Sequence, residues 1–457
     1  MHGKKQFRNL SFNVISRVTA AALAIAVVSA LTVVLTQSTQ AQTGVIYNFT
    51  GGADGGYPSS GLTADGAGNL YGTTCGQLCG GGTNSNGTVF QLSKRGSSWV
   101  FTTLYSFQGG SDGSAPISRV ILGPGGTLYG TTLSGGIDGG CNFWLSLTGC
   151  GTVFKLSPPT HVPPNAVGGT KSDAAGGWTE SVLYRFSGGS DGGNPFVGDL
   201  IFDEAGNLYG TTAIGGAIGA GAVYELTPTS GGWTETVLYS FGVNGDAWPL
   251  GGVVFDGSGN LYGSEFYGEA CGSLCGAVFQ LTPSGSGWTE NILYNFQGSG
   301  DGADPIGGLT FDQHGNLYGT TSEDTYYNAA GGTLFKLDAN DGWSFSLLYH
   351  FTSGNSSWGW PQGPWASLIA TDGAHGEKNF YGTTTGDGSY GNGSIFSWTY
   401  NSNGGWQYSN LWTFGGVQND GAYPISRVAF NGNDGYAYVT TQGGGTHGMG
   451  TVFRVSP

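Results

Sequence analysis

Aromatic residues recur at even spacings along the chain. In six segments a tryptophan is followed after six residues by a second aromatic residue and after eight by a phenylalanine. Even offsets place side chains on one face of an extended strand. The pattern therefore predicts six β-strands, each directing its three aromatic side chains to a single face. The six sets are Trp99/Tyr105/Phe107, Trp178/Tyr184/Phe186, Trp233/Tyr239/Phe241, Trp288/Tyr294/Phe296, Trp343/Tyr349/Phe351 and Trp406/Trp412/Phe414.

A second pattern alternates with the first. The letters GNLYGTT stand at 68–74, 206–212 and 315–321, and near copies stand at 126–132, 259–264, 379–384 and 436–441. Several copies follow Asp-x-x-Gly-Asn, which favours a hairpin turn, so we expect a strand entered through that turn. We expect Tyr71 and its equivalents to pack between neighbouring repeats. Gly72 and its equivalents should lie where neighbouring repeats approach too closely for a side chain.

The repeat contains four strands. The unit at 239–293, with the start of the next, holds LGGVVFD, NLYGSE, GAVFQL and WTENILYNF, separated by glycine-rich turns. Tyr184, Tyr239, Tyr294 and Tyr349 follow one another at intervals of 55 residues, and an insertion at 158–177 lengthens the second repeat. Four antiparallel strands at this period are typical of a β-propeller blade.

The two ends of the chain complete one repeat between them. VIYNF at 45–49 is the tail of a Trp-to-Phe strand, and TVFRV at 451–455 is a third strand with no fourth behind it. A ring closed in this way leaves no exposed sheet edges. We therefore predict an all-β, seven-bladed β-propeller with four-stranded blades in residues 42–457, its ring closed by the N-terminal strand completing the last blade.

The first 41 residues have the build of a secretory signal peptide. A basic start (Lys4, Lys5, Arg8 and Arg17) precedes an apolar run at 20–35 and small residues at 39 and 41. An uncleaved membrane anchor is the alternative. We expect cleavage and a secreted protein, extracellular or periplasmic, without membrane association.

Charge narrows the choice of partners. Residues 1–41 hold four basic and no acidic residues, so their removal leaves ten basic residues against 29 acidic ones, a net charge of −19. Such a chain repels phosphate backbones and anionic lipid, and we expect neither nucleic acid nor membrane as a partner. The 90 glycines could indicate disorder, but 13% aromatic residues favour many short strands joined by glycine-rich turns.

Six cysteines form three local pairs. An even number in an exported chain predicts disulfides. Zinc is the alternative, because C-x₃-C resembles half a zinc site, although no histidine stands near the pairs at ligand spacing. The pairs are Cys75/Cys79, Cys141/Cys150 and Cys271/Cys275.

The combination of LYxF, DGxxP, GNLYGTT and GTVFxL resembles the GloVer (Gloeo/Verruco) tandem repeats of bacterial exported proteins. The resemblance covers residues 45–457, and the Asp-x-x-Gly-Asn-Leu-Tyr hairpin is also similar to that of NHL-type propellers. The family implies export and a repeat fold. It implies no particular reaction or ligand.

Two sets of loops emerge on the same face of such a propeller. Loops that join the fourth strand of a blade to the first strand of the next carry Asp-Gly-x-x-Pro, and loops between second and third strands carry the cysteine pairs. We expect each aspartate to cap its own turn. The alternative is a Ca²⁺ site, which needs several oxygens on one ion, so we expect no resident cofactor. The aspartates are Asp54, Asp112, Asp191, Asp246, Asp301 and Asp420.

Departures from the repeat suggest a binding site on this face. The residue before the loop proline is Tyr57, Ala115, Asn194, Trp248, Asp304, Trp360 and Tyr423 in blade order. We expect Trp360, Tyr423 and Tyr57 to form an arc over the neighbouring blades 6, 7 and 1, to which blade 6 adds Trp358 and Trp365. Flat rings suit stacking against sugars or extended peptides. The alternative is that these rings only pack the loops down. The proposed ligand-binding residues are Tyr57, Trp358, Trp360, Trp365 and Tyr423.

Catalytic motifs are missing from the sequence. No Ser-His-Asp phrase, His-x-x-x-His or P-loop occurs. We therefore predict a binding or scaffold protein that recognises an extracellular glycan or a protein, without catalysis. The alternative is a carbohydrate-active hydrolase or lyase using carboxylates of this face, with Glu265, Asp301 and Asp304 as candidates.

Overall fold

A computed structural model describes residues 43–457 except for short internal stretches. Residues 44–457 form one compact unit. The predicted signal peptide lies outside the described residues. Within them, no helix has both the length and the apolar character needed to cross a membrane. The stretches not described are 77–85, 142–147, 160–176, 243–246, 269–274, 286, 325–330, 352–361, 374–376 and 402.

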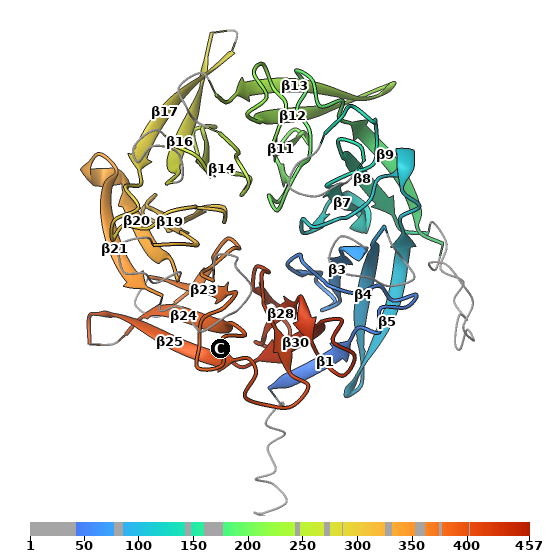
Figure 1. Ribbon diagram of the computed structural model, residues 1–457, viewed down its shortest axis with the longest axis vertical. Helices are drawn as coiled ribbons and strands as arrows, with labels where there is room; N and C mark the ends of the chain where they lie inside the picture. The colour runs from blue at the N-terminus through green and yellow to red at the C-terminus, as the bar shows by residue number, and fades with distance from the viewer. Residues whose placement is uncertain are drawn as a thin grey trace, which may run out of the picture. The chain divides into compact units, whose positions relative to one another are not determined.

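Seven four-stranded antiparallel sheets stand around a common centre as the blades of a propeller (Figure 1). The innermost strands are β2 (Thr63–Ala64), β6 (Ile121–Leu122), β10 (Ile201–Phe202), β14 (Val253–Phe255), β18 (Thr310–Phe311), β22 (Ile369–Asp372) and β27 (Ala429–Phe430). The second strands are β3 (Leu70–Thr74), β7 (Leu128–Thr132), β11 (Leu208–Thr212), β15 (Leu261–Glu265), β19 (Leu317–Thr320), β23 (Lys378–Thr384) and β28 (Ala437–Thr441).

Longer strands make up the outer half of each blade. The third strands are β4 (Thr88–Arg95), β8 (Thr152–Ser157), β12 (Ala222–Thr229), β16 (Ala277–Ser284), β20 (Thr333–Asp338), β24 (Ser394–Tyr400) and β30 (Thr451–Val455). The outermost are β5 (Ser98–Ser106), β9 (Thr179–Arg185), β13 (Gly232–Ser240), β17 (Gly287–Asn295), β21 (Ser344–His350), β25 (Trp406–Thr413) and β1 (Gly44–Asn48). Minor elements are β26 (Gly421–Ala422), β29 (Gly443–Gly444), η2 (Gly110–Asp112), η3 (Pro124–Gly126) and η5 (Ala339–Asp341).

The first and last strands of the chain share a blade. β1 pairs antiparallel with β30, so the sheet runs β1–β30–β28–β27, and the N-terminal strand is its outermost member. Figure 1 shows this blue strand beside the red strands of the C-terminal end. The predicted ring closure is confirmed, as are the number of blades and the number of strands in each.

The aromatic residues of the outer strands do not share one face, contrary to the expectation from their even spacing. The register between β4 and β5 shifts, so that Phe90 pairs with Thr103 whereas Val89 pairs with Tyr105. This bulge reverses the alternation of faces. Trp99 therefore packs with Tyr438 of blade 7, and Phe107 packs with Phe154 of blade 2. The same shift occurs in the outer strand of every blade.

Tyrosines of the repeated phrase lie between blades, as predicted. The ring of Tyr71 in blade 1 meets Trp178 of blade 2 edge-on at 6.4 Å. Its hydroxyl group donates a hydrogen bond to Asp65 of the preceding hairpin and accepts one from Gln91. Burial and the nearby Asp65 carboxylate raise the pKa of Tyr71 to about 12. The equivalent inter-blade pairs are Tyr129–Trp233, Tyr262–Trp343, Tyr318–Trp406 and Tyr438–Trp99.

Hydroxyl groups of the same phrase also join neighbouring blades. In blades 1, 4, 6 and 7 the position after the phrase glycine or its equivalent donates a side-chain hydrogen bond to a carbonyl group at the entrance of the next inner strand. Ser264 bonds Gly307 at 3.0 Å, and Thr383 bonds Ser426 at 2.9 Å. In these four blades the phrase therefore contributes both an aromatic and a polar contact to one blade interface.

The glycine of the repeated phrase is required by close packing inside its own blade. The prediction that it lies where neighbouring blades approach closely is therefore wrong. Gly72 pairs across the sheet with Phe90. A Cβ atom on Gly72 would lie 2.6 Å from the tip of the Phe90 ring and 2.9 Å from Leu62, both in the same blade. The phenylalanine of the third strand covers the glycine, which leaves no room for any side chain.

We expect Gly72→Ala to lower the free energy of unfolding by about 1–3 kcal/mol, because the added methyl group must displace the buried Phe90 ring. Gly66→Ala, in the hairpin of the same blade, is the matched control because its Cβ atom would meet nothing within 4 Å. Urea denaturation of both variants measures the effect. Equal midpoints for the two variants would contradict the steric account.

Candidate functional site

The two predicted loop sets meet on one face, which we call the disulfide-bearing face. The loop that enters a blade forms a β-bridge with that blade's second-to-third-strand loop. These bridges are Ser114–Ser134, Gly193–Ile214, Ala247–Tyr267, Ala303–Glu323 and the pair β26–β29. Both sets are thus held together as one surface.

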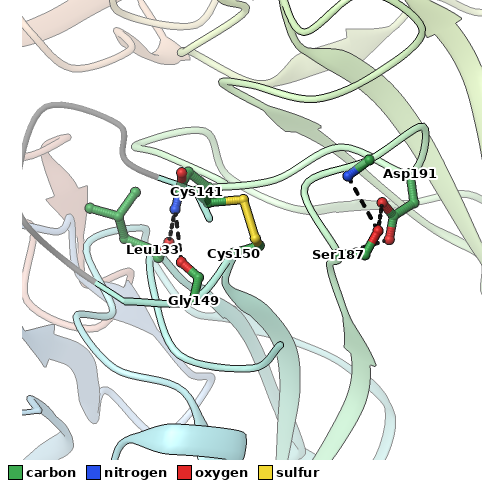
Figure 2. Close-up of a disulfide and its surroundings, with 8 residues drawn as sticks. Leu133, Cys141, Gly149, Cys150, Ser187 and Asp191 are labelled. Carbon is green, nitrogen blue, oxygen red and sulfur yellow. Dashed lines mark hydrogen bonds between the residues drawn. A yellow bond between two sulfur atoms is a disulfide. The ribbon is translucent and has the colours of Figure 1, made fainter. Parts of the chain in front are cut away.

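Cys141 and Cys150 form a disulfide in the second-to-third-strand loop of blade 2. Figure 2 shows it together with Ser187 and Asp191 of the loop that leads into blade 3. A Cβ atom on Gly188 of that loop would lie 2.2 Å from the Cys141 sulfur, so only glycine fits there. Cys75 and Cys275 are also disulfide-bonded, and Cys79 and Cys271 lie outside the described residues.

Aspartates of the Asp-Gly-x-x-Pro loops bind their own turns. Asp112 accepts hydrogen bonds from the Tyr105 hydroxyl group at 2.7 Å and from the Gln108 backbone N–H at 2.6 Å. The tyrosine lies seven residues before the aspartate, so the outer strand and the loop are tied together. Asp54, Asp191 and Asp301 repeat both contacts, and Asp420 accepts from the Gly415 N–H.

These contacts leave each carboxylate committed to a separate turn. Within the described residues, no three His, Cys, Asp or Glu side chains come together in a group that could hold a metal ion. Asp246 lies outside the described residues. The geometry therefore assigns the described aspartates a structural role as turn caps.

The residue before the loop proline has a left-handed backbone in six blades. This conformation is costly for residues other than glycine and asparagine, and a following proline does not relieve it. The side chains that occupy it nevertheless differ widely. The φ angles are 56° for Tyr57, 56° for Ala115, 50° for Asn194, 62° for Trp248, 57° for Asp304 and 58° for Tyr423.

Blade 6 departs from the assignment made on sequence. The carbonyl group of the residue before the loop proline accepts an N–H of the neighbouring loop, as Tyr57 accepts from Cys75. In blade 6 the acceptor is Gly363, bonded by Thr385 at 3.1 Å. Pro364 is thus the loop proline, and the expected assignment of Trp360 before Pro361 is wrong. Trp358 and Trp360 themselves lie outside the described residues.

The side chains at these left-handed positions are either buried or partly exposed. Asn194 is buried and donates to the carbonyl groups of Leu133 and Gly149, which fastens it to the disulfide loop. Trp248 stacks with Phe266 at a ring distance of 6.0 Å. Tyr57 and Tyr423, from the adjacent blades 1 and 7, remain half-buried.

Trp365 belongs to an apolar collar close to the propeller axis. It directly follows the loop proline of blade 6, and the corresponding residues of four other blades are buried in one hydrophobic cluster against which it packs. This cluster also contains Cys75. The corresponding residues are Ile117, Phe196, Leu250 and Ile306.

The three candidate acid–base residues lie in different environments. Asp301 caps its turn, whereas Asp304 is only 5% exposed and Glu265 only 1%. Burial, and secondarily Glu323, raises the pKa of Asp304 to about 8. Burial likewise raises the pKa of Glu323. Sequence reasoning paired Asp304 with Asp301, whereas its carboxylate neighbour is Glu323 of the loop bridged to it.

Below the collar lies a cavity on the axis, with a volume of about 20 Å³. This volume admits roughly one water-sized species. Its charged lining residues are Arg119, Asp199 and Arg427. Sequence reasoning missed them, although PISRV at 116–120 and 424–428 places the two arginines identically in blades 2 and 7.

A larger hollow of about 440 Å³ lies between blades 4 and 5 at their hairpin turns. Its aromatic lining includes Tyr262, Phe311 and Trp343, and Asp256 and Asp312 line it as well. Both carboxylates accept hydrogen bonds within their own hairpins. This groove lies at the opposite ends of the strands from the disulfide-bearing loops.

Residues 29–167 and 168–375 match the family described as the Gloeobacter/Verrucomicrobia repeat, which together is more than half of the chain. The chain belongs to the Gloeobacter/Verrucomicrobia repeat family. The fold therefore gives the GloVer repeat a structural meaning, since one repeat supplies one blade. No curated protein matches the sequence.

Solved structures resemble this chain at low sequence identity. An ancestral GH74 enzyme is 12% identical with a TM-score of 0.52, over 88% of this chain and 48% of that chain. A protein of unknown function from Dyadobacter fermentans DSM 18053 is also 12% identical, with a TM-score of 0.42 over 91% of this chain and 97% of that one. The GloVer chain thus spans about half of the GH74 enzyme, and the likeness concerns the fold alone.

We expect Asp112→Asn to lower the free energy of unfolding by about 1–3 kcal/mol, because an amide cannot replace both hydrogen bonds to the charged carboxylate. Asp138→Asn, which changes an exposed aspartate in a loop of the same blade, is the control for the lost charge.

Thermal melting of the unmodified protein with calcium and with chelator should give equal midpoints. A midpoint that falls on chelation would instead show that a metal supports these loops.

Asp304 should make stability depend on pH. Its folded pKa of about 8 lies above its ordinary value of 3.8, so the unfolded chain releases this proton first as the pH rises. The carboxyl group therefore costs stability progressively between about pH 4 and pH 8, at no more than about 1.4 kcal/mol per pH unit. Asp304→Asn removes the titrating proton, and asparagine tolerates the left-handed backbone.

The difference in unfolding free energy between Asp304→Asn and the unmodified protein should shift in favour of the variant from pH 5 to pH 8. Urea denaturation at both pH values measures it. Glu204→Gln, at an exposed glutamate, should show no such shift. Parallel pH dependence of Asp304→Asn and the unmodified protein would contradict a buried, protonated Asp304.

Proposed function

We propose that this GloVer propeller is an exported binding protein that recognises an extracellular glycan on its disulfide-bearing face. The observation that carries the proposal is the left-handed position before the loop proline. Backbone strain of about 1–3 kcal/mol per residue persists where surrounding structure maintains it, and such residues cluster at functional sites. Here the strained position holds Tyr57 and Tyr423 on adjacent blades, both partly exposed.

Variation at that position supports recognition rather than folding as the reason for the side chains. Asparagine or glycine would satisfy the backbone at less cost, and blade 3 does carry Asn194. Tyrosine instead adds a large flat ring at the loop surface. Flat rings supply apolar contact area at low cost in conformational entropy and suit the faces of sugar rings.

Exposed apolar side chains gather on the same face. Of the large hydrophobic residues with high exposure in the described part of the chain, four lie in its loops and two lie on outer strands. Apolar residues on a surface with few charges favour contact with a partner. The four are Ile137, Ile218, Tyr390 and Val417, which are 45–59% exposed.

A hydrolase or lyase is the second candidate, on the strength of Asp304 and Glu323. Both have raised pKa values, a feature of acid–base residues. The axial cavity, at about 20 Å³, is too small for a sugar ring. Asp304 is almost fully covered. The geometry thus supports binding better than turnover.

A glycan and polysaccharide array with the purified protein tests the proposal. We expect Tyr57→Asn and Tyr423→Asn each to weaken a positive signal at least about fivefold while the melting temperature is kept, because asparagine accepts the left-handed backbone. Gln313→Ala, in the groove between blades 4 and 5, is the matched control and should bind normally.

Three outcomes would count against this proposal. Binding lost in Gln313→Ala but kept in both tyrosine variants would move the site to the opposite face. Cleavage of the bound glycan, lost in Asp304→Asn, would establish the enzyme instead. An array without any signal would reject the glycan and leave a protein as the partner class.

A further inference from the structure

The axis of the propeller carries an unbalanced positive charge. Arg119 and Arg427 come from blades 2 and 7, and Asp199 comes from blade 3. All three line the same cavity of about 20 Å³, and no other charged side chain lines it among the residues that the structure describes. Two guanidinium groups therefore face one carboxylate.

The Asp199 carboxylate lies closer to Arg119 than to Arg427. Arg119 donates to Asp199 Oδ2 from Nε at 2.9 Å and from Nη2 at 2.7 Å, and its Nη1 donates to Thr63 at 2.9 Å. Arg427 Nη1 reaches the same Oδ2 atom only at 3.5 Å. Asp199 is thus shared by both guanidinium groups, closely with Arg119 and at longer range with Arg427, so the three lining groups keep one excess positive charge.

Arg427 also has an unused donor. Its Nε atom is buried and has no hydrogen-bond partner in the described chain. A buried donor without a partner is costly. The Arg427 side chain as a whole is 28% exposed, so its charge is only partly buried. Burial, followed by the neighbouring charge of Arg119, lowers the pKa of Arg427 to about 10, so the group stays protonated at neutral pH.

The surrounding backbone keeps space open for the two arginines. A Cβ atom on Gly61 of blade 1 would lie 3.0 Å from the Arg427 carbonyl oxygen and 3.1 Å from Arg119 Cδ, so glycine alone fits between them without displacement. Blades 4 and 5 present Gly251, Gly307 and Gly308 to the cavity. The lining that blades 4 and 5 supply is therefore mostly glycine, with Ile306 beside it, and the charged donors come from blades 2 and 7.

We propose that a single small monovalent anion, of the size of chloride, binds on the axis between Arg119 and Arg427. The cavity is large enough for one species of about the size of water and too small for a phosphate or sulfate group. The anion balances the excess guanidinium charge and accepts the unused N–H of Arg427. This site is independent of glycan recognition on the loops.

The test titrates chloride against gluconate at constant ionic strength and neutral pH. Binding to the folded state alone raises the melting temperature of the purified protein, by about 1–3 °C for each tenfold increase above the dissociation constant. Arg427→Gln should abolish this dependence, because it removes the excess positive charge. Asp199→Asn should shift the response to lower chloride concentrations, because it removes the competing carboxylate.

Arg185→Gln removes an arginine on the outer strand of blade 2, whose Nε bonds the Ser111 carbonyl group, and should keep the full chloride response. Crystals soaked in bromide provide a readout that does not require any variant to fold. An anomalous peak between Arg119 and Arg427 supports the site. Bromide peaks confined to the surface, or equal melting temperatures in chloride and gluconate, would overturn it.

Discussion

Packing between neighbouring blades is the interaction on which the rest of this structure depends. A blade is a single sheet, and an isolated four-stranded sheet has no second layer to cover its faces. The outer strand solves this problem by serving two interfaces. Trp99 packs on Tyr438 of one neighbour and Phe107 on Phe154 of the other. The bulge between them turns one strand into a two-sided connector, so each blade completes the core of the next around the ring.

The sequence predicted the number of blades because each blade repeats its own letters, and it predicted ring closure because the two ends hold complementary parts of one repeat. It did not predict the bulge. Offsets count residues, and an inserted residue such as the buried Leu104 leaves no distinctive letter behind. The reason for a glycine at position 72 was predicted wrongly, because its partner Phe90 stands 18 residues later in the sequence. The register of the two strands brings Phe90 opposite Gly72.

Loops were less predictable than strands for a related reason. Blade 6 holds two candidate prolines, Pro361 and Pro364, and neither follows Asp-Gly-x-x as the loop motif requires. Only the hydrogen bond from Thr385 to Gly363 decides between them. Asp304 was recognised as unusual, but its neighbour Glu323 lies in another loop and is brought near by a backbone bridge. Contacts between residues of different loops depend on which backbone groups pair across the loops, and a single sequence motif does not encode that pairing.

The axis and the rim impose different requirements on a ligand. The chain is strongly acidic, so it repels anions at long range, but salt screens exposed charges beyond about 10 Å at 0.1 M. An anion on the axis is therefore governed by Arg119 and Arg427 rather than by net charge. On the rim, Tyr57 and Tyr423 offer half-buried aromatic rings among acidic loops. A partner that stacks there would gain from apolar contact and lose by carrying negative charge. The electrostatics therefore agree with both proposals, a small anion at the centre and a neutral polysaccharide at the surface.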